Sequence, residues 1–126
     1  MGMHLLAVAL GSALGGCLRY LATLGVNALV QRAFPWGTLA VNVAGCLLIG
    51  MLHVFIVERG GQPETLRLFT MVGVMGGFTT FSSFSLETLL LVQQGAPGRA
   101  VAYVAASVVV CLAASVAGMA LARVAG

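Results

Sequence analysis

Charged side chains are scarce in this sequence. Only 7% of its 126 residues are charged, and lysine is absent, so every cationic side chain other than histidine is an arginine. Soluble domains carry about 25% charged residues, whereas this chain is 60% hydrophobic and has a mean hydropathy of +1.08. So little charge cannot cover a surface that faces water. The composition therefore predicts an integral membrane protein.

Several other chemistries are also missing. No Gly-x4-Gly-Lys motif is present to hold the phosphates of ATP. Cys17, Cys46 and Cys111 lack the spacing of metal ligands or redox pairs, and we interpret them as small buried apolar residues. No nucleophile, base and orienting residue fall together, so we expect no enzyme. The net charge of +3 reflects arginine anchors at the membrane interface, and we expect no nucleic acid partner.

Long uncharged runs separate the few charges, over residues 1–18, 33–57, 68–86 and 100–122. About 20 apolar residues cross the ~30 Å hydrocarbon core of a bilayer. We therefore predict an all-α protein with one domain, residues 1–126, of four transmembrane helices. Their expected ranges are about 4–30, 36–57, 66–92 and 100–123. The first run has no basic start and no convincing cleavage site, which favours a helix over a secretory signal.

The arginines specify orientation only weakly. With four spans, Arg59, Arg67 and Arg123 lie on one side of the membrane, and Arg32 and Arg99 lie on the other. A chain that inserts both ways can pair about a two-fold axis in the membrane plane. We therefore predict an antiparallel, dual-topology homodimer in the lipid bilayer. A single orientation set by a partner is the alternative.

One expected helix differs from the rest. Residues 73–87, GVMGGFTTFSSFSLE, carry a glycine pair, five hydroxyls and three phenylalanines. Lipid leaves a broken backbone unsatisfied, so such a segment must face protein or water. We expect helix 3 to break near its centre, beside Gly76 and Gly77, where freed backbone groups can bind an ion. The alternative is that the glycines only ease close packing, as expected for Gly15 in helix 1 and Gly118 in helix 4.

Aromatic rings alternate with hydroxyls along this segment. Phe81 and Phe84 lie among residues such as Thr80 and Ser83. The positive edge of an aromatic ring and a hydroxyl donor can both meet an anion. The pattern is consistent with a wall for a small anion, although it is not specific to one.

Other polar residues fall within the predicted spans. Asn42 is either a donor to an anion or the partner in an interhelical hydrogen bond. Tyr103 and Ser107 begin a weakly polar stripe on helix 4. Intramembrane ionisable groups suggest function. We favour a structural role for Arg19, and for Glu87 we leave open a vestibule carboxylate or a structural hydrogen-bond partner.

Three motifs together resemble one family. Gly76-Gly-Phe-Thr-Thr-Phe-Ser-Ser-Phe-Ser-Leu-Glu87, with Trp36-Gly-Thr-Leu-Ala-Val-Asn-Val-Ala-Gly45 and Gly15-Gly-Cys-Leu-Arg-Tyr20, closely resembles the CrcB/Fluc fluoride channel family. The resemblance covers all four expected helices in order. It implies a small antiparallel dimer that conducts fluoride passively, exports it from the cytoplasm across the bacterial inner membrane and lowers its toxicity.

The resemblance also implies residue roles. The backbone carbonyls of Gly76 and Thr79 would hold a structural sodium ion at the dimer axis. Cys111 stands where some members carry a hydroxyl residue. The implied fluoride pathway comprises Asn42, Thr80, Phe81, Ser83, Phe84, Glu87, Tyr103 and Ser107.

Two other functions compete with a channel. One is a proton-coupled exporter that resembles small four-helix multidrug transporters. Those depend on a carboxylate in helix 1, which this chain lacks, so Glu87 would have to couple the proton. The other is a structural assembly subunit without transport activity.

Overall fold

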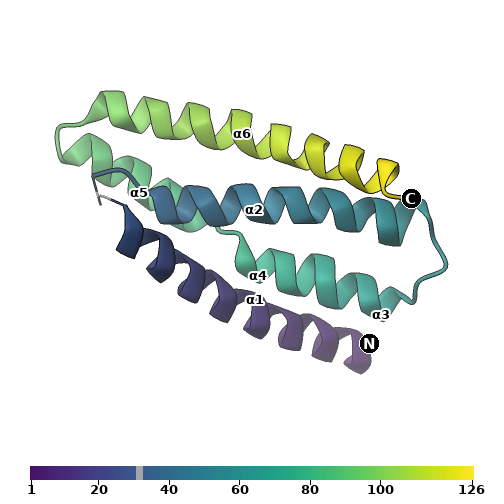
Figure 1. Ribbon diagram of the computed structural model, residues 1–126. Coiled ribbons are helices and arrows are strands. Elements are labelled where there is room, and N and C mark those ends of the chain that lie inside the picture. The colour runs from purple at the N-terminus through teal and green to yellow at the C-terminus, as the bar shows by residue number, and fades with distance from the viewer. Residues whose placement is uncertain (31–32) are drawn as a thin grey trace.

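The chain folds into antiparallel helical stretches joined by short connections (Figure 1). The computed structural model describes residues 1–30 and 33–126, and this part of the chain contains no strand. Arg32, one of the expected interface anchors, lies outside the described residues. The elements are α1 (Gly2–Leu29), α2 (Trp36–Leu52), the π-helical η1 (His53–Glu58), α3 (Glu64–Arg67), the π-helical η2 (Leu68–Met75), α4 (Gly76–Phe78), α5 (Phe81–Gln93) and α6 (Pro97–Val124).

Three of the helices are long and apolar enough to cross a membrane. They are α1, the continuous helix Trp36–Glu58 formed by α2 and η1, and α6. Large apolar side chains such as Leu112 and Val116 are exposed on their outer faces. Lipid rather than water suits such a surface, so the protein is an all-helical membrane protein, as its composition predicts. The remaining stretch, residues 64–93, is divided among α3, η2, α4 and α5.

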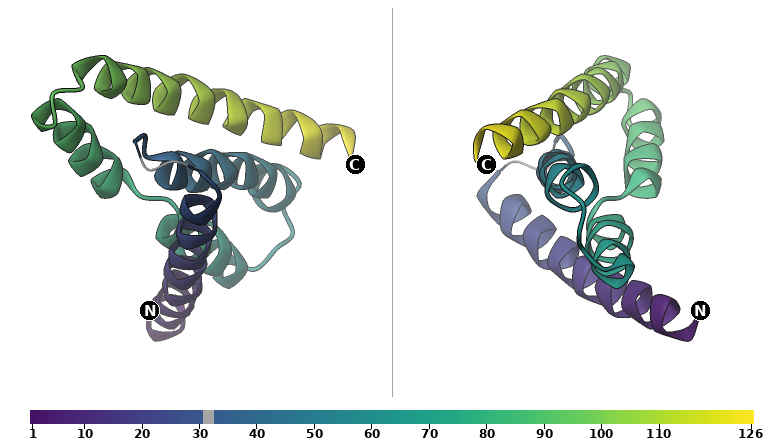
Figure 2. Two further views of the ribbon diagram at one scale, coloured as in Figure 1. Left: turned by 60° about the vertical axis from the view of Figure 1, so that its left-hand side comes forward. Right: turned by 90° about the vertical axis from the view of Figure 1, so that its right-hand side faces the viewer.

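Helix α2 lies at the centre of the arrangement. It contacts α1 and α6 as well as η2, α4 and α5 (Figure 2). Both termini lie at the same end of the molecule as the connection between η1 and α3 (Figure 1). At the opposite end, Gly95 turns the chain from α5 into α6 with a positive φ of 80°, which glycine adopts without steric cost. Pro97 then begins α6, where its missing N–H is not needed.

Glycines bring the helices into backbone contact. A Cβ on Gly15 would collide with the carbonyl of Val74, so α1 lies directly against η2. A Cβ on Gly118 would likewise collide with the carbonyl of Leu47, so α6 lies directly against α2. Small residues allow membrane helices to approach this closely. Both contacts agree with the close packing expected from these glycines.

Candidate ion pathway beside a helix break

The helical backbone is interrupted at Thr79 and Thr80, between α4 and α5. Both residues are extended, with φ and ψ of −87° and 156° for Thr79 and −148° and 115° for Thr80. The glycine pair expected at the break remains helical in α4. Gly77 instead packs against α1, where an added Cβ would lie 2.6 Å from the carbonyl oxygen of Ser12. The break therefore lies just beyond the glycine pair beside which it was expected, and Gly77 serves packing.

Side chains from other helices satisfy much of the interrupted backbone. The Asn42 side chain donates from Nδ2 to the Thr80 carbonyl at 3.1 Å and accepts from the Thr80 N–H at Oδ1 at 2.8 Å. Arg19 donates from Nε to the Gly77 carbonyl at 3.0 Å. At the start of α5, Thr80 Oγ1 accepts from the Ser83 N–H at 3.2 Å, as an N-cap residue does. Asn42 and Arg19 both stabilise the backbone at the break through hydrogen bonds.

These bonds redirect the usual donors of two carbonyls. In a continuous helix the N–H of residue i+4 bonds the carbonyl of residue i. The Thr80 N–H would serve Gly76, but it donates to Asn42. The Ser83 N–H would serve Thr79, but it donates to the Thr80 side chain. The Gly76 and Thr79 carbonyls thus lose their helical donors and can bind another positive group.

A cavity of about 440 Å³ lies beside the break. Its walls come from α2, α4, α5 and α6 and from the end of η2. Seven predicted site residues line it: Asn42, Gly76, Thr79, Thr80, Phe81, Phe84 and Ser107. The structure thus gathers most of the predicted site around one space.

Aromatic rings form a continuous series along the cavity. The centroids of Phe81 and Phe84 are 5.4 Å apart, and those of Phe84 and Tyr103 are 5.2 Å apart. Phe34 meets Tyr103 edge-on at 5.4 Å. Phe81 lines the cavity and is 79% exposed. Such rings offer their edges to an anion or their faces to one another.

Two hydroxyls beside these rings are buried without partners. Tyr103 is fully buried and Ser107 is 8% exposed. Within the described part of the chain, neither the Tyr103 hydroxyl nor the Ser107 Oγ has a hydrogen-bond partner. A buried donor left unpaired costs about 1–3 kcal/mol. Ser107 lines the cavity, so its hydroxyl can stabilise an acceptor there, whereas Tyr103 lies further along the ring series, beside Thr38 and Glu87.

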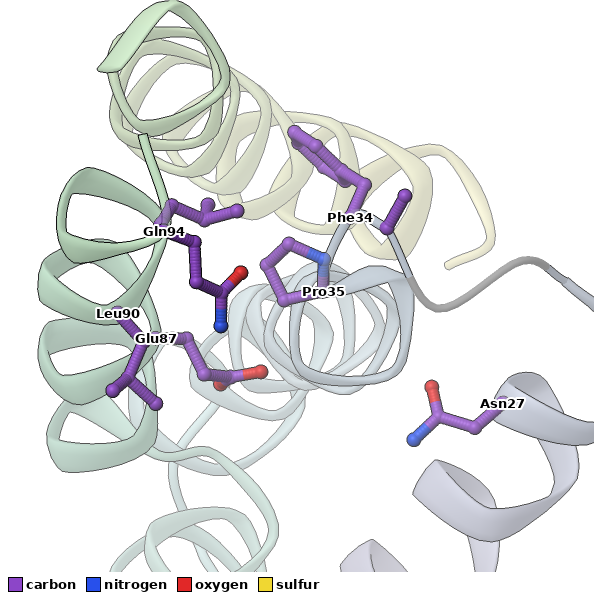
Figure 3. A pocket seen from close by; sticks show the side chains of 8 residues that line it. Asn27, Phe34, Pro35, Glu87, Leu90 and Gln94 are labelled. Carbon is purple, nitrogen blue, oxygen red and sulfur yellow. The ribbon is translucent and has the colours of Figure 1, made fainter. Parts of the chain in front are cut away.

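Glu87 lies near the end of the ring series, further along α5. Its Oε1 accepts from Thr38 Oγ1 at 2.6 Å, and Thr38 is buried. Glu87 also lines a second cavity, of about 180 Å³. Figure 3 shows Glu87 within α5 and Gln94 just beyond its end, with Asn27 across the opening. This cavity forms a polar mouth at the end of the molecule opposite the termini.

Sequence reasoning missed three residues of this region. Thr38, Asn27 and Gln94 were not proposed as site residues, although Thr38 precedes Asn42 by four residues and so shares its helix face. That spacing was the available signal for Thr38. Asn27 and Gln94 lie near helix ends, where polar residues are common, so nothing marked them. Ser83, which was predicted, bonds through its backbone N–H and does not line the larger cavity.

Together, the fold and the cavity define a class of protein. Apolar helices surround an interrupted helix, and the Ser107 hydroxyl and the rings of Phe81 and Phe84 line the space beside it. The chain is a small helical membrane protein with a few polar groups placed around an internal space.

Comparison with known proteins identifies the family. The family described as CrcB-like protein, Camphor Resistance (CrcB), matches residues 6–119, and the chain belongs to it. Among its relatives is a protein of Hahella chejuensis named fluoride-specific ion channel FluC, which is 50% identical over 95% of this chain and 94% of its own length. A FluC of Rhizobium meliloti is 47% identical over 95% of this chain and 96% of its own. These relatives are named as ion channels, in agreement with the expectation that the protein is no enzyme.

Proposed function

We propose that this protein is a passive, fluoride-selective channel that exports fluoride from the cytoplasm across the bacterial inner membrane and so lowers its toxicity. The names of the relatives support the choice of ion. Within this chain, the observation that carries the proposal is the pair of buried, unpaired hydroxyls of Tyr103 and Ser107 beside the Phe84 ring. Donors without protein partners are what a dehydrated anion needs.

The physical chemistry of fluoride explains why several weak donors are required. Fluoride is small and strongly hydrated, so a pathway must replace its lost water. Conduction also demands binding weak enough for the ion to leave, which favours many modest contacts over one tight site. Hydroxyls and ring edges meet both demands. The side-chain amide of Asn42 bonds Thr80 through its oxygen and one of its N–H groups. Its second N–H is therefore available to the ion.

The pathway we propose follows the ring series between the two cavities. Fluoride passes Ser107, the rings of Phe81 and Phe84, and Tyr103, with the hydroxyl of Thr80 and the Ser83 position on the neighbouring face of α5. Glu87 lies at the mouth, where its hydrogen bond to Thr38 keeps the carboxylate turned toward α2. A carboxylate held in this way repels the anion less than a free one.

We further propose that residues 64–93 form a fourth span and that two chains assemble in antiparallel orientations. Phe81, Ser82 and Ser85 are exposed on α5. Hydroxyls at membrane depth do not belong in lipid, which favours a second copy of the chain against this face. The nearly balanced arginine count is consistent with insertion in both orientations.

A structural sodium ion at the dimer axis fits the break. Carbonyl oxygens are suitable ligands for a hard cation, and the Gly76 and Thr79 carbonyls have lost their helical donors. Two chains would offer four such oxygens. A cation held there supplies positive charge near the anion path and offsets part of the cost of dehydrating fluoride.

Electrode-monitored fluoride efflux from reconstituted liposomes tests the function. A channel conducts down the electrochemical gradient, and a negative-inside potential drives an anion outward with about 2.3 kcal/mol per 100 mV. We expect efflux that follows voltage and is unchanged by an imposed pH gradient. The alternative is a proton-coupled exporter working through Glu87, and it predicts efflux that accelerates with a proton gradient. Absence of flux from folded protein would instead indicate a structural subunit.

A further inference from the structure

Two cysteines line the larger cavity close to the proposed ion pathway, and neither has a role in that pathway. Cys46 on α2 and Cys111 on α6 both line this cavity, as do Met71 and Met75 of η2. Cys46 follows Asn42 by four residues, and Cys111 follows Ser107 by four residues. Each thiol thus lies one helical turn beyond a polar residue of the cavity. Both cysteines are free thiols.

The contact between α2 and α6 brings the thiols together. Gly118 packs on the carbonyl of Leu47, and Gly50 packs on the carbonyl of Ser115, so the two backbones touch at this level. Ser115 Oγ also donates to the Cys46 carbonyl at 3.2 Å. The Cys46 and Cys111 side chains are close enough to interact directly. Cys17 does not line this cavity and is exposed on α1.

We propose that Cys46 and Cys111 form a binding site for a soft, two-coordinate metal ion of the mercuric class. Thiolates select soft metals, and no group of three His, Cys, Asp or Glu gathers within the described residues to hold a metal of higher coordination. A divalent mercuric ion needs only two thiolates.

Charge balance favours this ion in a largely apolar space. Each thiol gives up its proton as an S–Hg bond forms, so one Hg²⁺ replaces two protons and the product is neutral. Neither sulfur nor metal changes oxidation state. A neutral product avoids the cost of burying a net charge. A bound metal would also obstruct the proposed fluoride path beside Ser107, a consequence that rests on the proposed function.

Metal titration of a Cys17→Ser protein tests the site without measuring transport. We expect one Hg²⁺ per chain, two protons released per metal, and thiolate-to-mercury absorption in the ultraviolet. Adding Cys46→Ser or Cys111→Ser should halve the proton release. A competing monothiol should also remove the metal from either variant at a concentration at least about tenfold lower. With one cysteine left, the metal is held by a single protein thiolate and loses the advantage of two ligands in the same molecule.

The outcomes separate the metal site from the channel. If both added variants retain mercury as tightly as Cys17→Ser, or if Cys17→Ser releases one proton per metal, the two-thiol site is wrong. Gel filtration checks folding, and Cys111→Thr replaces any serine variant that fails to assemble. Flux is then measured: efflux blocked by mercury in Cys17→Ser and unaffected in the double variants supports the site within the path. Tight binding without any block would contradict the path while the metal site stands.

Discussion

Asn42 serves the backbone of another helix. Its amide gives the Thr80 N–H and carbonyl the partners that a continuous helix would have supplied. From sequence alone this residue could equally donate to an anion or bond across helices. The structure shows the bond across helices, and one Asn42 N–H remains available to donate to an anion.

Asn42→Ala tests this double role. We expect a lower unfolding midpoint in detergent, because an unpaired buried polar group costs about 1–3 kcal/mol and two Thr80 groups would lose their partner. Fluoride flux should fall as well. Circular dichroism melts and liposome efflux measure the two effects, with Gln93→Ala, an exposed amide change, as the control. Unchanged stability together with full flux would make Asn42 dispensable.

The ring series leads to a second prediction. Phe81→Ile and Phe84→Ile remove the ring edges but keep an apolar side chain of moderate size. Ring interactions are worth about 0.5–1.5 kcal/mol, so each change should reduce fluoride flux by up to roughly tenfold. Assembly, followed by gel filtration, should be preserved. Phe55→Ile is the matched control. Phe55 belongs to η1, its ring lies under the Arg59 guanidinium, and it does not line the cavity. Wild-type flux in both test variants would contradict the assignment of the Phe81 and Phe84 rings to the pathway.

Helices illustrate what sequence can and cannot predict here. Length and apolar character mark α1, Trp36–Glu58 and α6 as candidate spans, because crossing a bilayer constrains both. A fourth span over residues 64–93 stays a proposal. The break lies at Thr79 and Thr80, just beyond the glycine pair beside which it was expected. Glycine freedom is a local property, whereas the stability of extended Thr79 and Thr80 depends on Asn42, a partner from a different helix. The contact between Thr38 and Glu87 depends in the same way on how helices pack.

The close packing of helix α1 on η2 gives a prediction about stability. Gly15→Ala should lower the free energy of unfolding by about 1–3 kcal/mol, because the new methyl group would meet the Val74 carbonyl. Gly25→Ala on the same helix meets nothing within 4 Å and should be neutral or slightly stabilising. Thermal unfolding in detergent compares them. Equal effects of the two substitutions would contradict the backbone contact.

The break itself predicts a dependence on sodium. If the Gly76 and Thr79 carbonyls hold the ion in the dimer, removing sodium from both sides leaves these oxygens facing one another without a cation. We expect slow loss of the dimer and of flux during prolonged dialysis into a large organic cation, and recovery when sodium returns. Gel filtration follows the dimer. Indifference to sodium after long dialysis would count against the site.

At the scale of the whole molecule, the single chain is incomplete as a conduit. Phe81 is 79% exposed, and exposed serines flank it on α5. A surface that combines a bare ring with hydroxyls at membrane depth suits neither lipid nor an isolated monomer. We propose that a second chain supplies the missing wall. An antiparallel second chain would also bring the two breaks together on the dimer axis.

Opposite orientations can be separated by moving a few charges. Gln62→Lys with Arg99→Gln concentrates positive charge at the end that carries the termini, whereas Arg67→Gln with Gln93→Lys and Gly98→Lys concentrates it at the other end. Gln62, Gln93, Gly98 and Arg99 are exposed and Arg67 is partly exposed. The ion pair of Arg67 with Glu64 that one change removes contributes little at a surface. Each set should therefore lock one orientation, which the accessibility of a C-terminal reporter measures.

An antiparallel dimer needs both orientations at once. Each locked form expressed alone should support little fluoride efflux and little growth in fluoride, and their co-expression should restore both. A protein that works in one orientation behaves differently: at least one locked form alone then equals the wild type, and adding the other brings no gain. Because both sets keep the cavity residues intact, loss and rescue report on the pairing of orientations and not on damage to the pathway.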